Sequence, residues 1–331
     1  MRLYCSGWQA TNAKREEAVV KDNYLKYRCF SFSMIRKLTG LPYFLKGLQG
    51  AYDACRAGGV GIMMDSGVVS WRTHCNTLAK QGKTEALAKV IGEKEFIQQY
   101  VDYVKERHHE WDFFMTIDLA RISSEIFKRY IAIEKMVAPL GVKPLPVLHG
   151  DDNVSKYIGM YADRGCTFVA LATAKVLRNR QTQFRHYLEA CFEAGERYGV
   201  KFHGLAFTSI WMMLEFPMFS ADSSSWSRVA GFGGIMIYDE IKQRMHTYHI
   251  SERVSDAKGK GSDLQLNSRM MDHVREYVTH TGYDFDVMRK GDGEEAFIER
   301  HKWNARTMYL LAEAATKKHG KEQGHFNPLI K

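Results

Sequence analysis

The segment Val60-Gly-Ile-Met-Met-Asp-Ser-Gly67 is a short apolar run that ends in an acidic residue and a glycine turn. Its length and apolar character are typical of a buried β-strand, with Asp65 at the carboxyl end. Comparable runs recur along the chain at intervals that leave room for a helix. Together they make eight expected strands, Tyr27–Phe32, Val60–Asp65, Phe113–Asp118, Leu145–His149, Cys166–Ala172, Phe202–Phe207, Phe216–Asp222 and Phe232–Tyr238.

The segments between these strands have the spacing of amphipathic helices. Val90–Glu106, 122–137 and Gln181–Tyr198 each place apolar residues on one helical face, and Pro139 ends the second of them. Strands that alternate with helices predict parallel pairing through crossover helices. The expected fold class is therefore α/β, a closed (β/α)8 TIM-type barrel with a C-terminal helical extension. A dinucleotide-binding sheet is disfavoured because no glycine fingerprint follows the first strand.

The domain organisation follows from where these patterns end. We expect residues 1–331 to form a single domain, with the barrel and its catalytic site in about 25–240. Residues 241–331 would hold a basic loop at 251–265 and two helices, near 266–280 and 293–318.

Composition narrows the class of protein. The 331 residues are 45% hydrophobic, which excludes a disordered chain, and no apolar run reaches the roughly 18 residues of a membrane span. The first residues lack the apolar core of a signal peptide, and six scattered Cys without a CxxC pair fit reduced thiols. These features predict a cytoplasmic protein without membrane contact. The net charge of +9 favours a polyanionic partner.

Polar residues recur where the expected strands end. In a parallel barrel the active-site groups come from those ends, so Asp65, Asp118 and Asp222 would converge on one pocket, near His149 and His203. Each acid can instead cap a following helix, an explanation favoured for Asp151 and Asp152, and the histidines can be ordinary core residues. Paired carboxylates suggest displacement at an anomeric carbon, with one as nucleophile and the other moving a proton. No metal-ligand spacing and no GxSxG motif point to other chemistry.

Two of these strand ends resemble a known family. Met64-Asp-Ser-Gly-Val-Val-Ser70 and Ala221-Asp-Ser-Ser-Ser-Trp226 resemble the tRNA-guanine transglycosylase superfamily, most closely its DNA-directed branch in phages and bacterial islands. The resemblance covers about residues 25–240. It implies an enzyme without cofactor that exchanges guanine in DNA for a 7-deazaguanine base, such as the nitrile-bearing preQ0, through a covalent Asp-deoxyribosyl intermediate.

The resemblance also implies roles for individual residues. Asp222 would be the nucleophile and Asp65 the general acid and base. The base would be bound by the motif residues Ser66, Gly67, Val68 and Val69, by Asp118 at its amidine edge, by His149 in place of the family's usual Gln, and by the backbone at Gly204.

The sequence departs from the tRNA enzymes at two places. Val68, Val69 and Ser70 stand where those enzymes have a Gly, an aromatic residue and Gln, and no Cys follows Cys191, so their structural zinc site has no ligands here. Both departures favour DNA as the substrate and leave tRNA as the alternative.

The partners would be DNA or tRNA and a free 7-deazaguanine base, and homodimers are common in that family. Phosphate contacts are expected from two basic clusters, each of which can also be a solvated surface: Lys175, Arg178, Arg180 and Arg185, and Arg253, Lys258 and Lys260. Two further alternatives stay open. One is a barrel glycoside hydrolase that uses Trp71 and Trp226 as sugar platforms, and the other is a non-catalytic nucleic-acid-binding partner subunit.

Overall fold

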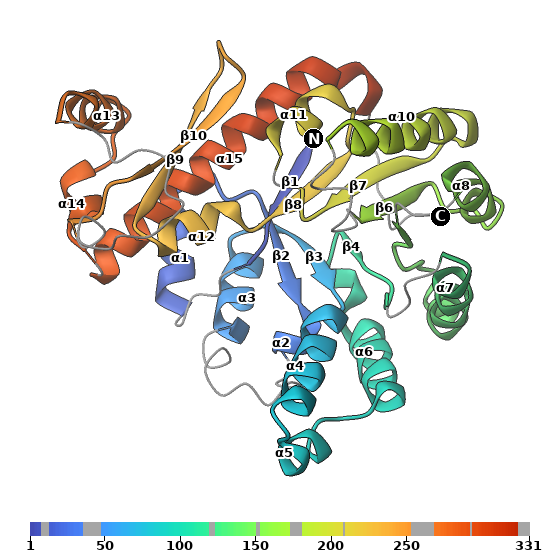
Figure 1. Ribbon diagram of the computed structural model, residues 1–331. Coiled ribbons are helices and arrows are strands. Elements are labelled where there is room, and N and C mark those ends of the chain that lie inside the picture. The colour runs from blue at the N-terminus through green and yellow to red at the C-terminus, as the bar shows by residue number, and fades with distance from the viewer. Residues whose placement is uncertain are drawn as a thin grey trace.

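An all-parallel sheet of eight strands, curled round on itself with helices on its outside, forms the centre of the protein (Figure 1). The computed structural model describes residues 1–7, 13–35, 48–118, 123–149, 153–172, 181–207, 209–252, 268–291 and 293–323. The strand order is β4-β3-β2-β1-β8-β7-β6-β5. The strands are β1 (Arg2–Cys5), β2 (Tyr27–Ser31), β3 (Gly61–Asp65), β4 (Phe113–Phe114), β5 (Val147–His149), β6 (Phe168–Ala172), β7 (Lys201–Leu205) and β8 (Ser220–Ser223).

The two outer strands of this sheet, β4 and β5, are linked by a parallel bridge between Met115 and Leu145. The Leu145 N–H donates to the Phe114 carbonyl at 2.7 Å, and the Leu145 carbonyl accepts from the Thr116 N–H at 2.9 Å. The predicted α/β fold, a TIM-type (β/α)8 architecture with a C-terminal helical part, is confirmed.

One strand of the ring differs from the prediction. The expected eighth strand, Phe232–Tyr238, is β9 (Gly234–Asp239), which pairs antiparallel with β10 (Arg244–His249) outside the barrel. Its place is taken by β1, which pairs with β2 and β8. The four residues of β1 are too few to show a strand pattern in the sequence. The ring therefore runs from Arg2 to Ser223 rather than over 25–240.

Helices cover the outer face of the sheet, and their apolar sides form the main core against it. The expected helices at 90–106, 122–137 and Gln181–Tyr198 correspond to α6 (Glu93–Arg107), α7 (Ser123–Val137) and α10 (Gln181–Tyr198). No helix among the described residues has the length and apolar character that crossing a membrane requires. The helices that accompany the strands are α1 (Ala13–Lys21), α2 (Phe32–Ile35), α3 (Leu48–Ala57), α4 (Val68–Lys80), α5 (Thr84–Ala88), α6 (Glu93–Arg107), α7 (Ser123–Val137), α8 (Val154–Ala162), α10 (Gln181–Tyr198), α11 (Ile210–Glu215) and α12 (Ser225–Gly231).

The C-terminal part consists of the β9–β10 hairpin and the helices α13 (Ser268–His280), α14 (Phe285–Arg289) and α15 (Glu294–Gln323). The side chain of Asn304 on α15 joins the hairpin to α12, because it accepts from the Met236 N–H at 2.8 Å and donates to the Trp226 carbonyl at 2.9 Å. Met308 and Leu311 on the same helix belong to the main core. Most of the basic loop expected at 251–265 lies outside the described residues.

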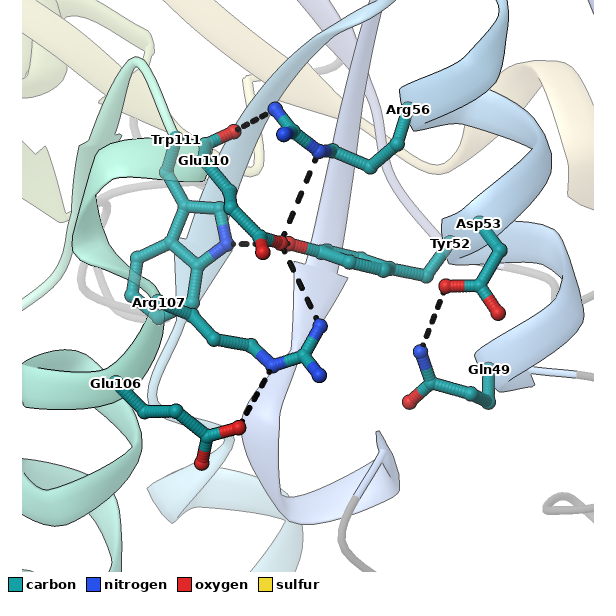
Figure 2. A network of polar contacts seen from close by, with 8 residues as sticks. All are labelled: Gln49, Tyr52, Asp53, Arg56, Glu106, Arg107, Glu110 and Trp111. Carbon is teal, nitrogen blue, oxygen red and sulfur yellow. Dashed lines mark hydrogen bonds and ion pairs between the residues drawn. The ribbon is translucent and has the colours of Figure 1, made fainter.

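A polar network ties α3 to the segment between α6 and β4 (Figure 2). The Trp111 indole N–H donates to the Tyr52 hydroxyl at 2.9 Å, and that hydroxyl donates to the Glu110 carboxylate. Arg56 and Arg107 lie 3.7 and 3.5 Å from the same carboxylate. Because β3 follows α3 and β4 follows this segment, the network braces two neighbouring strands of the barrel.

The interior of the barrel is filled by side chains. Tyr4, Met63, Phe113, Phe168 and Phe219 are among its buried residues, and their aromatic rings meet edge to face. The core is packed rather than hollow, as is usual for this fold, so a ligand site is expected above these side chains.

Candidate active site

A cavity of about 480 Å³ lies at the carboxyl ends of the barrel strands. It is lined by seven of the residues that the sequence predicts as a site: Asp65, Ser66, Val68, Val69, Asp118, His149 and Asp222. These residues come from the ends of β3, β4, β5 and β8, the end of the barrel at which this fold carries active sites. The predicted convergence of the three carboxylates on one pocket is confirmed.

Asp65 is held at the end of β3 by the turn that follows it. The N–H of Gly67 donates to Asp65 Oδ2 at 3.1 Å. Burial and, after it, the negative charge of Asp222 raise the pKa of Asp65 from 3.8 to about 6, with a smaller rise from Asp118 and a lowering by the backbone N–H groups of Gly67 and Ser66. Asp65 therefore exchanges protons near neutral pH, which is the property a general acid and base needs.

Gly67 fits this turn because it has no side chain. Its φ of +70° lies in the left-handed region, and an added Cβ would lie 2.1 Å from Ser33 Oγ and 2.2 Å from Ser31 Oγ. Gly67 itself does not line the cavity. Its contribution is to direct its N–H at Asp65 and to begin α4 beside β2.

We expect Gly67→Ala to lower the free energy of unfolding by about 2–3 kcal/mol, from backbone strain and the clash with the two serines. Gly82→Ala is the matched control, because Gly82 has a φ of +66° with nothing within 4 Å of an added Cβ. It should cost about 1 kcal/mol. Urea unfolding measures both variants, and equal losses would rule out the close approach as a constraint.

Asp222 is a buried carboxylate at the end of β8, 7% exposed. Its Oδ1 accepts a hydrogen bond from the Ala206 N–H at 2.8 Å and lies 3.4 Å from His203 Nε2. No hydrogen bond joins Oδ2 to any residue that the structure describes. One oxygen is anchored and the other is available, which suits a nucleophile.

Ala206 belongs to the candidate site, and sequence reasoning missed it. It follows β7 with a φ of +51°, a left-handed conformation that a non-glycine residue adopts only under constraint. This conformation accompanies the hydrogen bond from its N–H to Asp222. Alanine has no preference for left-handed backbone, so the sequence carries no signal for it.

Asp118 and His149 form a pair that joins the ends of β4 and β5. His149 Nε2 lies 2.5 Å from Asp118 Oδ2. Asp118 Oδ1 is buried and has no hydrogen-bond partner among the described residues. An unpaired buried carboxylate oxygen is costly, so the site favours a ligand that brings N–H donors.

Gly204 does not occupy the predicted place at the ligand. It is not among the residues that line the cavity, and the Phe207 ring fills the space beside it, 2.6 Å from where a Cβ would lie. A side chain at Gly204 would point toward the Phe207 ring in the helix layer, whereas Leu205 faces the opposite side and lines the cavity, together with Ala206 beyond the end of the strand.

Of the residues predicted to contact nucleic acid, only Arg185 lies in the part of the chain that the structure describes. Arg185 forms an ion pair with Glu215 at 2.6 Å and lies over the Trp211 ring, and its side chain stays 42% exposed. Its phosphate contact remains a prediction. The other predicted residues lie outside the described part of the chain, as do Asp151 and Asp152: Lys175, Arg178, Arg180, Arg253, Lys258 and Lys260.

Trp71 and Trp226 do not lie where they could stack against a sugar in the cavity. Trp71 is 8% exposed and donates to the Ile91 carbonyl, and Trp226 is fully buried and donates to the Ser6 carbonyl. Neither lines the cavity.

In the described part of the chain, no three His, Cys, Asp or Glu side chains gather as a metal site would require. Comparisons with protein-family models, with curated proteins and with solved structures found no match to this chain.

Proposed function

We propose that this protein is a transglycosylase that exchanges guanine in DNA for a 7-deazaguanine base. The observation that carries the proposal is the presence in one cavity of two carboxylates, half-buried Asp65 and buried Asp222, with different surroundings. Asp65 has a pKa raised to about 6, and Asp222 has one oxygen anchored by a backbone N–H. Carboxylates with separate acid–base and nucleophilic tasks are expected to differ in this way.

The first half-reaction displaces guanine. A lone pair of Asp222 Oδ2 attacks C1′ of the nucleotide, and the bond between C1′ and the purine nitrogen breaks with its electron pair going to the base. Protonated Asp65 supplies the proton that the departing base needs. The charge on Asp222 stabilises the oxocarbenium character at C1′ during this step.

The second half-reaction reverses these movements. The ring nitrogen of the incoming 7-deazaguanine attacks C1′, and the bond from C1′ to Asp222 Oδ2 breaks, so its electrons return to the carboxylate. Asp65, now ionised, takes the proton from the incoming base. One group serves both directions because its pKa lies near the working pH.

Asp118 and His149 would recognise the base. Asp118 Oδ1 is a buried acceptor without a hydrogen-bond partner among the described residues, and guanine and 7-deazaguanines share the N–H donors of their amidine edge. His149 would hold the second oxygen of Asp118 and face the base carbonyl.

The target base must leave the DNA stack to enter the cavity, so the substrate is a flipped base or a single strand. The proposal keeps DNA as substrate because of the net charge of +9 and because no Cys follows Cys191, whereas the tRNA enzymes carry zinc-binding cysteines there. A glycoside hydrolase is less favoured since Trp71 and Trp226 are buried and do not line the cavity. A non-catalytic subunit would not need Asp222 in the cavity wall.

Release of labelled guanine tests the function. Purified protein is incubated with guanine-labelled DNA or with labelled tRNA, plus excess preQ0 as the incoming base. We expect release from DNA alone. Release from tRNA alone would move the protein to the RNA-directed enzymes, and release from neither, with a folded protein, would contradict base exchange by this chain.

His149→Leu should raise the KM for the free base by roughly 10–100-fold, because Asp118 loses the partner that holds its carboxylate. His149→Gln is the matched variant, since an amide N–H still reaches Asp118 and Gln is the family's usual residue. Its KM should change by less than about tenfold. Exchange kinetics at several base concentrations measure both, and equal effects would remove His149 from base recognition.

A further inference from the structure

The buried histidine inside the barrel lies beside the anchored oxygen of Asp222. His203 is fully buried, and its ring is surrounded by those of Tyr4, Phe113 and Phe168 at 6.2, 5.3 and 6.4 Å between centroids. Packing of this kind is compatible with a core histidine that has no task. The polar groups beside its two ring nitrogens indicate a role in the site instead.

The strand register places three polar side chains in a row. His203 on β7 is the direct partner of Ser220 on β8, and Asp222 is two residues further along β8, on the same face. His203 Nδ1 lies 2.8 Å from Ser220 Oγ, and Nε2 lies 3.4 Å from Asp222 Oδ1. Among the described residues, Nε2 has no hydrogen-bond partner.

The proton positions follow from the chemistry of these groups. An ionised carboxylate only accepts hydrogen bonds, so the nitrogen that faces Asp222 must carry a proton if the contact is attractive. Nδ1 of a neutral ring is then an acceptor, and the Ser220 hydroxyl donates to it. Ser220 thereby fixes the tautomer that directs an N–H at Asp222. A separation of 3.4 Å is long, as catalytic hydrogen bonds often are before the substrate binds.

We propose that His203 is a positioning residue for the nucleophile, set by Ser220, and that it assists the departure of the Asp222 carboxylate in the second half-reaction. This inference rests on the proposed function. The Ala206 N–H and His203 Nε2 both face Asp222 Oδ1, which leaves Asp222 Oδ2 to attack C1′ of the nucleotide.

The two N–H donors at Asp222 Oδ1 affect the second half-reaction more than the first. In the covalent intermediate Oδ1 is an ester carbonyl, and as the C1′–Oδ2 bond breaks the returning electron pair spreads over both oxygens. Donors at Oδ1 bind the carboxylate more strongly than the ester, so they speed the second half-reaction. Losing one should slow that step most and let the covalent intermediate accumulate.

His203→Phe tests this assignment, because it keeps an aromatic ring in the cluster and removes both nitrogens. We expect kcat for base exchange to fall by roughly 10–100-fold, with the KM for DNA changed by less than about threefold. The fraction of enzyme trapped on DNA during steady turnover should rise above that of the wild type. His203→Gln, which restores an N–H donor, should recover part of the rate.

Two further variants separate positioning from packing. Ser220→Ala should act in the same direction as His203→Phe, with a smaller loss, and should have no further effect in the His203→Phe background. Tyr4→Phe is the control, because it removes only the part-buried hydrogen bond of 2.6 Å from the Tyr4 hydroxyl to Asp112 in the same aromatic cluster and leaves both N–H groups that face Asp222 in place. It should keep the wild-type rate.

The kinetics of His203→Phe decide whether His203 positions Asp222. Unchanged kcat in His203→Phe, or a loss without accumulation of the trapped adduct, would overturn the inference while base exchange by the wild type still stands. Absence of exchange by the wild type would overturn both. If His203→Phe does not unfold cooperatively, Ser220→Ala alone carries the test, and wild-type kinetics in that variant would overturn the assignment.

Discussion

Asp222→Asn is expected to abolish base exchange, by at least about 10³-fold, and to prevent covalent trapping of DNA. An amide is a poor nucleophile toward C1′ and cannot offset the oxocarbenium charge. The amide oxygen can still accept the 2.8 Å hydrogen bond from the Ala206 N–H, so the fold and the cavity should persist. DNA affinity should stay within about threefold of the wild type, because the proposed phosphate contacts would supply most of it and do not involve Asp222.

Denaturing gel electrophoresis of enzyme mixed with labelled DNA measures the trapping. Asp112→Asn is the matched control, because Asp112 precedes β4, at the end of the barrel opposite the cavity. There its carboxylate accepts a hydrogen bond from the Tyr4 hydroxyl. That variant should trap DNA as the wild type does. Trapping retained by Asp222→Asn would assign the nucleophile to another residue and remove the mechanism proposed above.

Asp65→Asn is expected to have opposite effects on activity and stability. Exchange should fall by roughly 10²–10⁴-fold, since neither the departing nor the incoming base can exchange its proton with an amide. In the wild type, the rate of guanine displacement should decline as pH rises through about 6, where Asp65 loses its proton. In the variant this decline should be absent from the residual rate.

The stability effect follows from the direction of the pKa shift. Between the unfolded value of 3.8 and the folded value of about 6, the folded wild type holds a proton that the unfolded chain has released. Its stability therefore falls as pH rises through this window, by on the order of 2–3 kcal/mol in total.

Asp65→Asn has no such loss. Its free energy of unfolding should equal that of the wild type near pH 4 and exceed it by about 2–3 kcal/mol at pH 7.5. The amide oxygen can still accept from the Gly67 N–H. Denaturant unfolding at both pH values measures the difference, and a variant less stable than the wild type at pH 7.5 would contradict the raised pKa of Asp65.

Much of the candidate site was predictable because of one rule of chain geometry. The carboxyl ends of parallel strands meet at one end of a barrel, so an acid that directly follows an apolar run can be placed there without coordinates. Asp65, Asp118 and Asp222 each follow such a run, and all three line the cavity. Gly204 shows the limit, because one position along a strand turns a residue to the opposite face.

The strand assignment failed at one point for a related reason. Apolar character identifies a strand but does not identify its partner. Gly234–Asp239 is as apolar as the barrel strands, yet it pairs antiparallel with Arg244–His249, and its Met236 backbone is bonded to Asn304. Arg2–Cys5, with only four residues, becomes a central strand because it pairs on both sides.

The sequence by itself determined the α/β class, the alternation of strands and helices, and the acids at the strand ends, because these depend on local periodicity and on order along the chain. Only the tertiary structure decided which strand completes the ring and which oxygen of Asp222 is anchored. It also brought Ala206 and His203 to that oxygen and Asp118 to His149. These contacts join residues from different strands, and their distances depend on register and side-chain direction, which no local pattern specifies.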